Sequence, residues 1–291
     1  MQLLIYLFLY PFLWSISKFP FRLLYLLSDI FYIFTYYVIG YRKKTVRENL
    51  ALTLPHLSTK ERLIIEKKSF KNMCDVFLEM IKTLTISKRE MERRYQFKNI
   101  EVYHDLEKKG KSIALLCAHY ASYEWAVSLN SKISFEGYAV YKKINNRYFD
   151  KLVRDIRSKF KATLITTKET IPVMGNNFRN KKPSLYGLIS DQSPRFGSFF
   201  HWNKFMGIEV PIHTGGEMLA KKYDMNVIFL RTKKNGRGYY EAEFEVLSEN
   251  AKEEPNYAIT DRFLKLVEQQ IYEQPEYYLW THKRWKYKKL S

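Results

Sequence analysis

The sequence is poor in cysteine, glycine, proline and acidic residues. Its 291 residues include 2 Cys, 11 Gly and 9 Pro, with 30 acidic residues against 49 basic ones. Two cysteines exclude a disulfide scaffold and a Cys-rich metal site, and the low Gly and Pro content excludes collagen-like and low-complexity chains. A hydrophobic content of 46%, with 16% aromatic residues, excludes a disordered chain. A mean hydropathy of −0.37 excludes a polytopic membrane protein.

The shortage of acidic residues leaves a formal net charge of +19. Such a charge favours a polyanionic partner, which can be nucleic acid, anionic lipid or an acidic protein. The charge is unevenly distributed, because residues 1–40 contain only Lys18, Arg22 and Asp29, a sum of +1. The other residues therefore carry 47 basic and 29 acidic side chains, or +18. A nucleic-acid-binding protein has no need of such an apolar head, so the distribution favours a membrane surface.

The head, residues 1–41, contains two apolar runs at positions 3–14 and 23–41. It has no basic start and no small-residue cleavage site, which excludes a secretory signal. A spanning helix needs about 20 apolar residues, but the first run is shorter and contains Pro11, and the second contains Asp29. We therefore expect a membrane anchor that either spans once or dips into one leaflet. The alternative is a pair of buried core helices.

The cluster Arg42-Lys43-Lys44, with Arg47, follows the head directly. By the positive-inside rule it places the remaining chain in the cytoplasm. Residues 42–291 contain no internal repeat and no linker long enough to separate two domains, so we expect a single domain after the anchor.

Short apolar runs alternate with helical patterns along this domain. Residues 58–97 are expected to be helical and begin with a capping box, Ser58 with Glu61. Strands are expected at 112–118, 137–141, 162–165, 185–190, 226–231, 239–246 and 277–281, and helices at 122–130, 146–160, 213–223 and 257–272. This order predicts an α/β fold with a mixed, mostly parallel sheet and helices on both faces.

The first candidate site is His119, directly after the buried strand 112–118, with Glu124 five residues later. Open α/β sheets bind ligands at the carboxyl ends of their strands. A histidine in the turn and a glutamate in the first turn of the next helix can meet. A carboxylate would then fix the imidazole tautomer and suit it to act as a general base. The alternative is a strand-end histidine that merely caps a backbone group.

Two further sites lie at strand ends. Lys142 and Asn146 follow the strand 137–141 and lead to a helix that carries Arg154 and Arg157. These residues can bind phosphate or stabilise an oxyanion, or they can form a solvated basic face. Asp191 and Gln192 follow the strand 185–190 and precede an aromatic loop, an arrangement that can line an acyl groove or reflect only an Asx turn.

No protein nucleophile accompanies His119. The sequence contains no Gly-x-Ser-x-Gly, His-Glu-x-x-His, P-loop or Gly-x-Gly-x-x-Gly motif, and Cys117 lies in a buried strand. These absences favour direct attack by a substrate hydroxyl, without a covalent enzyme intermediate.

Five motifs, which occur along the chain in the order typical of the family, make it resemble the lipid A biosynthesis late acyltransferases, within the wider lysophospholipid acyltransferase group. They are His119-x4-Glu124, Tyr141-Lys142 with Asn146 and Arg157, Asp191-Gln192, the terminal Tyr278-x-Trp280-x-His282-x-Arg284-Trp285-Lys286, and the early Val46-x-x-Asn49-Leu50 with Pro55. The match covers nearly the whole chain. One departure is Lys142, where the family usually has arginine, and this weakens a bidentate role there.

The resemblance implies transfer of a fatty acyl chain from an acyl carrier protein thioester, less often from coenzyme A, to a hydroxyl of a lipid A precursor. It implies His119 as the base, Glu124 as the group that holds it, and Arg157 at the oxyanion or the acceptor. Lys142, Asn146, Asp191, Gln192 and Arg284 would bind substrate or shape the site. It further implies a place on the cytoplasmic face of the bacterial inner membrane. The implied partners are acyl carrier protein, a phosphorylated glycolipid and the anionic membrane surface. No metal or other cofactor is expected, because a thioester is already activated. A nucleic-acid partner is not expected either.

Other interpretations remain open from the sequence. Within the same fold, the acceptor can be another glycolipid, an aminolipid or a pigment precursor. A membrane-tethered nucleic-acid-binding protein is favoured only by charge, and a non-catalytic membrane module is disfavoured by the intact His119 and Glu124.

Overall fold

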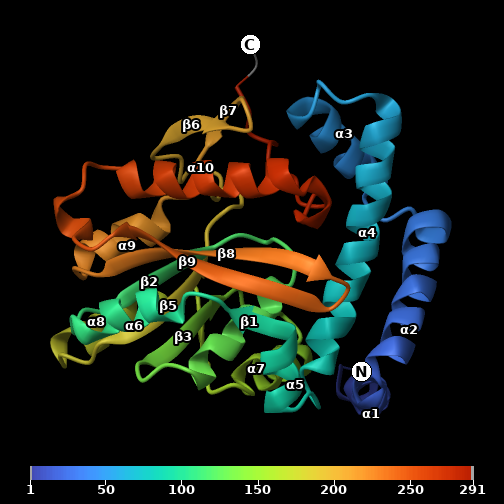
Figure 1. Ribbon diagram of the computed structural model, residues 1–291, viewed down its shortest axis with the longest axis horizontal. Helices are drawn as coiled ribbons and strands as arrows, with labels where there is room; N and C mark the ends of the chain where they lie inside the picture. Colours follow the sequence, from blue (N-terminus) through green and yellow to red (C-terminus); the bar gives the residue numbers. More distant parts are fainter. Residues whose placement is uncertain (1, 290–291) are drawn as a thin grey trace.

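The computed structural model describes residues 2–289, which form a seven-stranded sheet surrounded by helices (Figure 1). The strand order is β1-β9-β8-β2-β5-β3-β4, and every neighbouring pair is parallel except β8 with β9. The prediction of an α/β fold with a mostly parallel sheet is confirmed. The strands are β1 (Tyr95–Phe97), β2 (Ile113–Cys117), β3 (Glu136–Tyr141), β4 (Thr163–Thr166), β5 (Ser184–Ile189), β8 (Asn226–Gly236) and β9 (Tyr239–Ser248).

Strand β2 lies at the centre of the sheet, between β5 and β8. All five of its side chains are buried, because helices cover both faces of a parallel sheet. This explains its unbroken apolar sequence. A second, two-stranded sheet of β6 (Trp202–Phe205) and β7 (Ile208–Pro211) was not expected from the sequence.

The helices of the domain pack around this sheet. Helices α9 and α10 contact β8, and α7 contacts β4. The elements are α3 (Lys43–Thr53), α4 (Thr59–Lys82), α5 (Lys88–Arg94), α6 (Ile100–Lys108), α7 (Arg147–Ser158), α8 (Thr170–Arg179), α9 (Gly215–Lys222) and α10 (Ala258–Glu273), with short helical turns η2 (Tyr123–Ser131), η3 (Ala251–Glu253) and η4 (Pro275–Tyr277).

Two expected elements differ from those observed. The predicted helix 58–97 is wrong beyond Lys82, because Ser87 caps a new helix, α5, and residues 95–97 pair with β9 as β1. The capping box of Ser58 and Glu61 is present as expected. The predicted strand 277–281 is also wrong: this segment forms a single antiparallel bridge, Tyr120 with Tyr278.

The head forms α1 (Gln2–Lys18), α2 (Phe21–Ile33) and a π-helical extension of α2, η1 (Phe34–Ile39), which ends at Gly40. The long helix α4 runs along one end of the sheet, and α2 packs on its outer side (Figure 1). The hairpin between β8 and β9 points at α4. The head therefore lies against the domain along its length.

Candidate active site

His119 and Asp191 meet at the carboxyl ends of two paired strands. Strands β2 and β5 are parallel, with Cys117 opposite Ile189, so the residues two positions further on come side by side. Asp191 Oδ1 lies 2.8 Å from His119 Nδ1 and also accepts a hydrogen bond from the His119 backbone N–H at 3.1 Å. The sheet register thus brings the two side chains together.

The His119–Asp191 contact fixes the imidazole tautomer. An ionised carboxylate can only accept hydrogen bonds, so His119 Nδ1 carries the proton and Nε2 is left as the acceptor. Burial alone would raise the pKa of Asp191, but the charge of His119 and the hydrogen bonds from its ring and backbone outweigh burial and lower that pKa. Asp191 is therefore a buried anion that orients His119 and can stabilise its imidazolium form.

The C-terminal segment holds the turn that carries His119. The Ala121 N–H donates to the Tyr277 carbonyl at 2.9 Å, and the Leu279 N–H donates to the His119 carbonyl at 3.1 Å. Ala121 has a positive φ of 48°, which makes the turn sharp. The C-terminal motif, far away in sequence, thus supports the loop at the end of β2.

The expected partner of His119, Glu124, binds a different residue. Glu124 lies in the first turn of η2, as the spacing predicted, but its carboxylate accepts two hydrogen bonds from Arg157, at 2.7 Å from Nε and 2.5 Å from Nη2. Within residues 2–289, no hydrogen bond joins Glu124 to His119. The prediction that Glu124 holds His119 is wrong for this structure, because Asp191 occupies Nδ1 and α7 brings the Arg157 guanidinium to Glu124.

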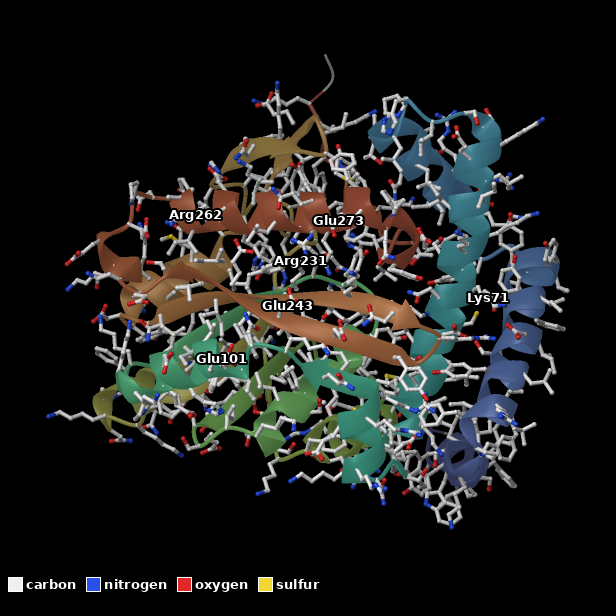
Figure 2. All side chains as sticks on the ribbon, viewed as in Figure 1. Lys71, Glu101, Arg231, Glu243, Arg262 and Glu273 are labelled. Atoms are coloured by element: carbon white, nitrogen blue, oxygen red, sulfur yellow. The ribbon has the colours of Figure 1, made fainter. Side chains whose placement is uncertain are left out.

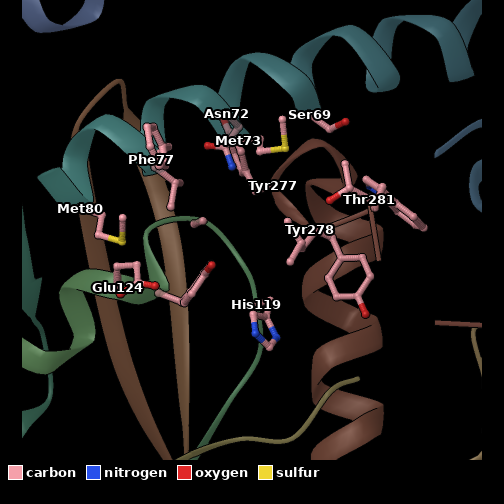
Figure 3. Close-up of a pocket in the computed structure, with 15 residues that line it drawn as sticks. Ser69, Asn72, Met73, Phe77, Met80, His119, Glu124, Tyr277, Tyr278 and Thr281 are labelled. Atoms are coloured by element: carbon pink, nitrogen blue, oxygen red, sulfur yellow. The ribbon is translucent and has the colours of Figure 1, made fainter. Parts of the chain in front are cut away.

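Two cavities meet at these residues. A cavity of about 860 Å³ extends into the domain and is lined by apolar side chains, among them Leu115, Val140, Leu164, Leu185 and Leu188. A smaller cavity of about 170 Å³ lies between α4 and residues 277–281, as Figure 3 shows. His119, Tyr123 and Glu124 line both. A histidine that offers an acceptor nitrogen between an apolar cavity and a second opening fits a reaction between two substrates.

Some of the remaining predicted site residues line these cavities, and others do not. Lys142, Gln192 and Arg157 line the large cavity. Asn146 caps α7 instead, with its side-chain oxygen accepting from the Tyr148 and Phe149 N–H groups. Its role in substrate binding stays a prediction, as do those of Lys142 and Gln192.

Arg284 was expected to bind substrate, but it is buried, with only 1% of its surface exposed. Its Nε donates to the Asp191 carbonyl at 2.7 Å, and its guanidinium packs on the Phe205 ring. The structure therefore places Arg284 behind Asp191, where it supports the strand end. Cys117 is buried in β2, and burial raises the pKa of its thiol to about 12, which agrees with a packing role.

One buried carboxylate near the site was missed in the sequence. Glu79 on α4 accepts hydrogen bonds from the hydroxyls of Tyr25 and Ser122 at 2.8 Å and of Tyr240 at 2.9 Å. Ser122 lies between His119 and Glu124, so Glu79 links the head, α4 and the active-site turn. Its only signal in the sequence is its acidic character within the otherwise apolar stretch 76–81.

The fold and site together define an α/β protein in which a histidine, oriented by a buried carboxylate, lies at a strand end beside an apolar cavity. A family comparison agrees: residues 2–287 match the model of the bacterial lipid A biosynthesis acyltransferases, and the chain belongs to that family. It is accordingly an enzyme of the acyltransferase class. A search of curated proteins found no significant match.

Proposed function

We propose that this enzyme transfers a fatty acyl chain from an acyl carrier protein thioester to a hydroxyl of a lipid A precursor, at the cytoplasmic face of the bacterial inner membrane. The family supports acyl transfer in lipid A biosynthesis, and the donor and acceptor are our proposal. The observation that carries it is His119, fixed through Nδ1 by Asp191 and placed where the two cavities meet.

In this mechanism His119 Nε2 removes the proton from the acceptor hydroxyl as its oxygen attacks the thioester carbonyl carbon. The C–S bond of the resulting tetrahedral intermediate then breaks. The ester remains on the acceptor, and the thiolate of the carrier takes the proton from the His119 imidazolium. Asp191 stabilises that imidazolium, so one proton passes from acceptor to leaving group without a covalent enzyme intermediate.

The two cavities divide the substrates between them. The large cavity is mostly apolar and suits the acyl chain of the donor, since burying methylene groups is favourable. The smaller cavity, between α4 and residues 277–281, then receives the acceptor hydroxyl. Arg157 lines the large cavity and lies in an ion pair with Glu124, where it can stabilise the oxyanion that forms on the thioester carbonyl.

The basic surface supports the proposed partners. Acyl carrier protein is acidic, lipid A precursors carry phosphates, and the cytoplasmic leaflet is anionic. All three would be attracted by a net charge of +19.

The test is acyl transfer by purified full-length protein from acyl carrier protein thioester to a lipid A precursor, followed by mass spectrometry. We expect the precursor to gain one acyl chain, and His119→Ala to lower the rate by about 10³-fold, because a general base contributes 10²–10⁴-fold. The melting temperature of His119→Ala serves as the folding control.

Full activity of a folded His119→Ala protein would overturn the mechanism. If the unmodified protein acylates other glycolipids but leaves lipid A precursors unchanged, the acceptor assignment is wrong and the acyltransferase chemistry stands.

A further inference from the structure

The segment Phe21–Ile39 is long and apolar enough to cross a membrane, but its contacts place it elsewhere. We infer that the described part of the head, residues 2–41, lies within one leaflet of an anionic membrane along the surface of the domain, and that neither of its helices crosses the bilayer. This inference rests on the proposed function only for the identity of the membrane, the bacterial inner membrane.

The first argument is that α4 holds α2 and its extension η1 over most of their combined length through polar contacts. The Tyr25 hydroxyl donates to Glu79 at 2.8 Å, the Ser28 hydroxyl to Asp75 at 2.7 Å, and the Tyr36 hydroxyl to Glu66 at 2.7 Å. Residues 25–36 cover about 16 Å at 1.5 Å per residue, more than half of a hydrocarbon core of about 30 Å. If α2 crossed the membrane with these contacts intact, the charged helix α4 would have to cross with it.

The second argument is the charge at the centre of the segment. Asp29 lies near the middle of Phe21–Ile39 and pairs with Arg237 at 2.8 Å and with Lys71 at 3.2 Å. Arg237 also pairs with Asp75. In a spanning α2 these four charges would lie near the bilayer centre, where charged side chains are costly.

Arg237 belongs to the tip of the β8–β9 hairpin, so the central sheet itself would have to enter the bilayer. Figure 2 shows Lys71 on the side of α4 that faces α2. The hairpin tip fits closely against α2: Gly238 has a positive φ of 77°, and a Cβ there would collide with the Tyr25 hydroxyl. The hairpin and α2 therefore approach so closely that position 238 has no room for a side chain.

The third argument is that α1 touches the domain at both of its ends. The Tyr6 ring stacks on Tyr148 of α7 at a centroid distance of 5.4 Å. At the other end, buried Lys82 of α4 donates to the carbonyls of Ser17 and Phe19, both at 2.8 Å. Because the two ends of α1 contact the same domain, α1 cannot pass to the other side of a membrane.

The outward face of the head fits a single leaflet. Leu26, Ile30, Phe34 and Val38 recur at four-residue spacing on α2 and η1, and Phe8 and Phe12 do so on α1. Each of these side chains is more than half exposed. Such an extended apolar face marks an interaction site.

Cations flank this face. Lys18 and Arg22 lie beside the turn between α1 and α2, and Arg42, Lys43 and Lys44 follow the end of η1. Apolar side chains bordered by cations are typical of helices that lie in the headgroup region of an anionic leaflet.

The test is the side of the membrane from which single cysteines react. Leu3→Cys, Lys18→Cys and Lys44→Cys are each made in the full chain and treated with a membrane-impermeant maleimide. One sample is intact spheroplasts and the other is inverted inner-membrane vesicles. The two native cysteines, Cys74 and Cys117, are buried, so the unmodified chain gives the background.

We expect all three positions to react only in the inverted vesicles. Reaction of Lys18→Cys in spheroplasts, with Lys44→Cys protected there, would show that α2 crosses the bilayer and would overturn the inference. Leu3 and Lys18 reacting from opposite sides would show that α1 crosses, with the same consequence.

A second measurement tests the leaflet contact itself. In flotation with phosphatidylglycerol–phosphatidylethanolamine vesicles, the double variant Leu26→Glu/Ile30→Glu should bind at least tenfold less protein than the unmodified chain. Phe178→Glu, a change at an exposed aromatic residue on α8, should bind within twofold. Equal binding by the double variant and the unmodified chain would contradict the proposed face.

Acyl transfer to a detergent-solubilised lipid A precursor is assayed on the same preparations. Absence of transfer by the unmodified chain would overturn the proposed function, and the labelling pattern would still decide how the head lies.

Discussion

Asp191 at the active site and Glu79 beneath the head are both fully buried carboxylates, but their pKa values shift in opposite directions. Burial raises the pKa of each. At Asp191 the charge of His119 and its hydrogen bonds outweigh burial and lower the pKa. At Glu79 burial prevails and the pKa is raised, although Lys234 and the hydrogen-bonding hydroxyls oppose it.

The difference teaches that partners, and not depth, decide the charge of a buried acid. Asp191 faces an ionisable ring and is kept as an anion, which in the proposed mechanism serves proton transfer. Glu79 receives three hydroxyls and no cation within hydrogen-bonding distance among residues 2–289, and it joins the head to the active-site turn. In the proposed mechanism Asp191 takes part in the chemistry, whereas Glu79 only positions the elements around it.

The largest expected effect separates Asp191 from Glu124, the acid that the sequence spacing had placed beside His119. Asp191→Asn should lower kcat by about 10³-fold, because the amide no longer fixes the tautomer or stabilises the imidazolium. Glu124→Gln keeps one hydrogen bond to Arg157 and should lower kcat by only about tenfold, one charge-assisted bond being worth about 1.5 kcal/mol. Steady-state kinetics of both purified variants gives the comparison. The reverse order would restore Glu124 as the partner of His119.

A smaller effect is expected on stability at Glu79. Glu79→Ala leaves buried hydroxyls of Tyr25, Ser122 and Tyr240 without an acceptor, and should cost about 3 kcal/mol or more at about 1–3 kcal/mol per unsatisfied group. Glu79→Gln retains neutral hydrogen-bonding capacity and should cost about 1 kcal/mol. Denaturant unfolding measures both. If Glu79→Gln is as unstable as Glu79→Ala, Glu79 acts through its charge, and the contrast with Asp191 disappears.

The smallest effect is on the pH dependence of stability, which should have opposite signs at the two acids. The folded-state pKa of Asp191 is below its ordinary value of 3.8, so its contribution is present above pH 3.8 and is lost as the pH falls through the folded value. The folded-state pKa of Glu79 is above 4.5, so its contribution is present below pH 4.5 and is lost as the pH rises through the folded value.

Unfolding free energies measured from pH 3 to pH 8 test this prediction. Relative to Asp191→Asn, the unmodified protein should lose stability towards low pH, and relative to Glu79→Gln it should lose stability towards high pH. If the stability difference between the unmodified protein and the variant changes with pH in the same direction for both variants, the opposite pKa shifts of the two carboxylates are contradicted.

Local patterns in the sequence predicted most of the sheet. The buried strands 112–118 and 185–190 and the antiparallel strand 239–246 were recognised within a residue or two of their observed ends, since an unbroken or alternating apolar pattern is a local property. Residues 95–97 and 277–281 were not predicted correctly. Their conformations depend on long-range partners, β9 for the first and the His119 turn for the second.

The sequence by itself determined the α/β class, the apolar head with its basic border, and the position of His119 and Asp191 at strand ends. Spacing along the chain, however, pointed to Glu124 as the partner of His119. Only the tertiary structure decided that β2 and β5 are neighbours in a register that sets Cys117 opposite Ile189 and Asp191 beside His119. The same holds for the head, whose length and composition allow a span, whereas its polar contacts with α4 and the β8–β9 hairpin place it along the domain. In both cases the decisive partner is distant in the sequence, and no local pattern encodes it.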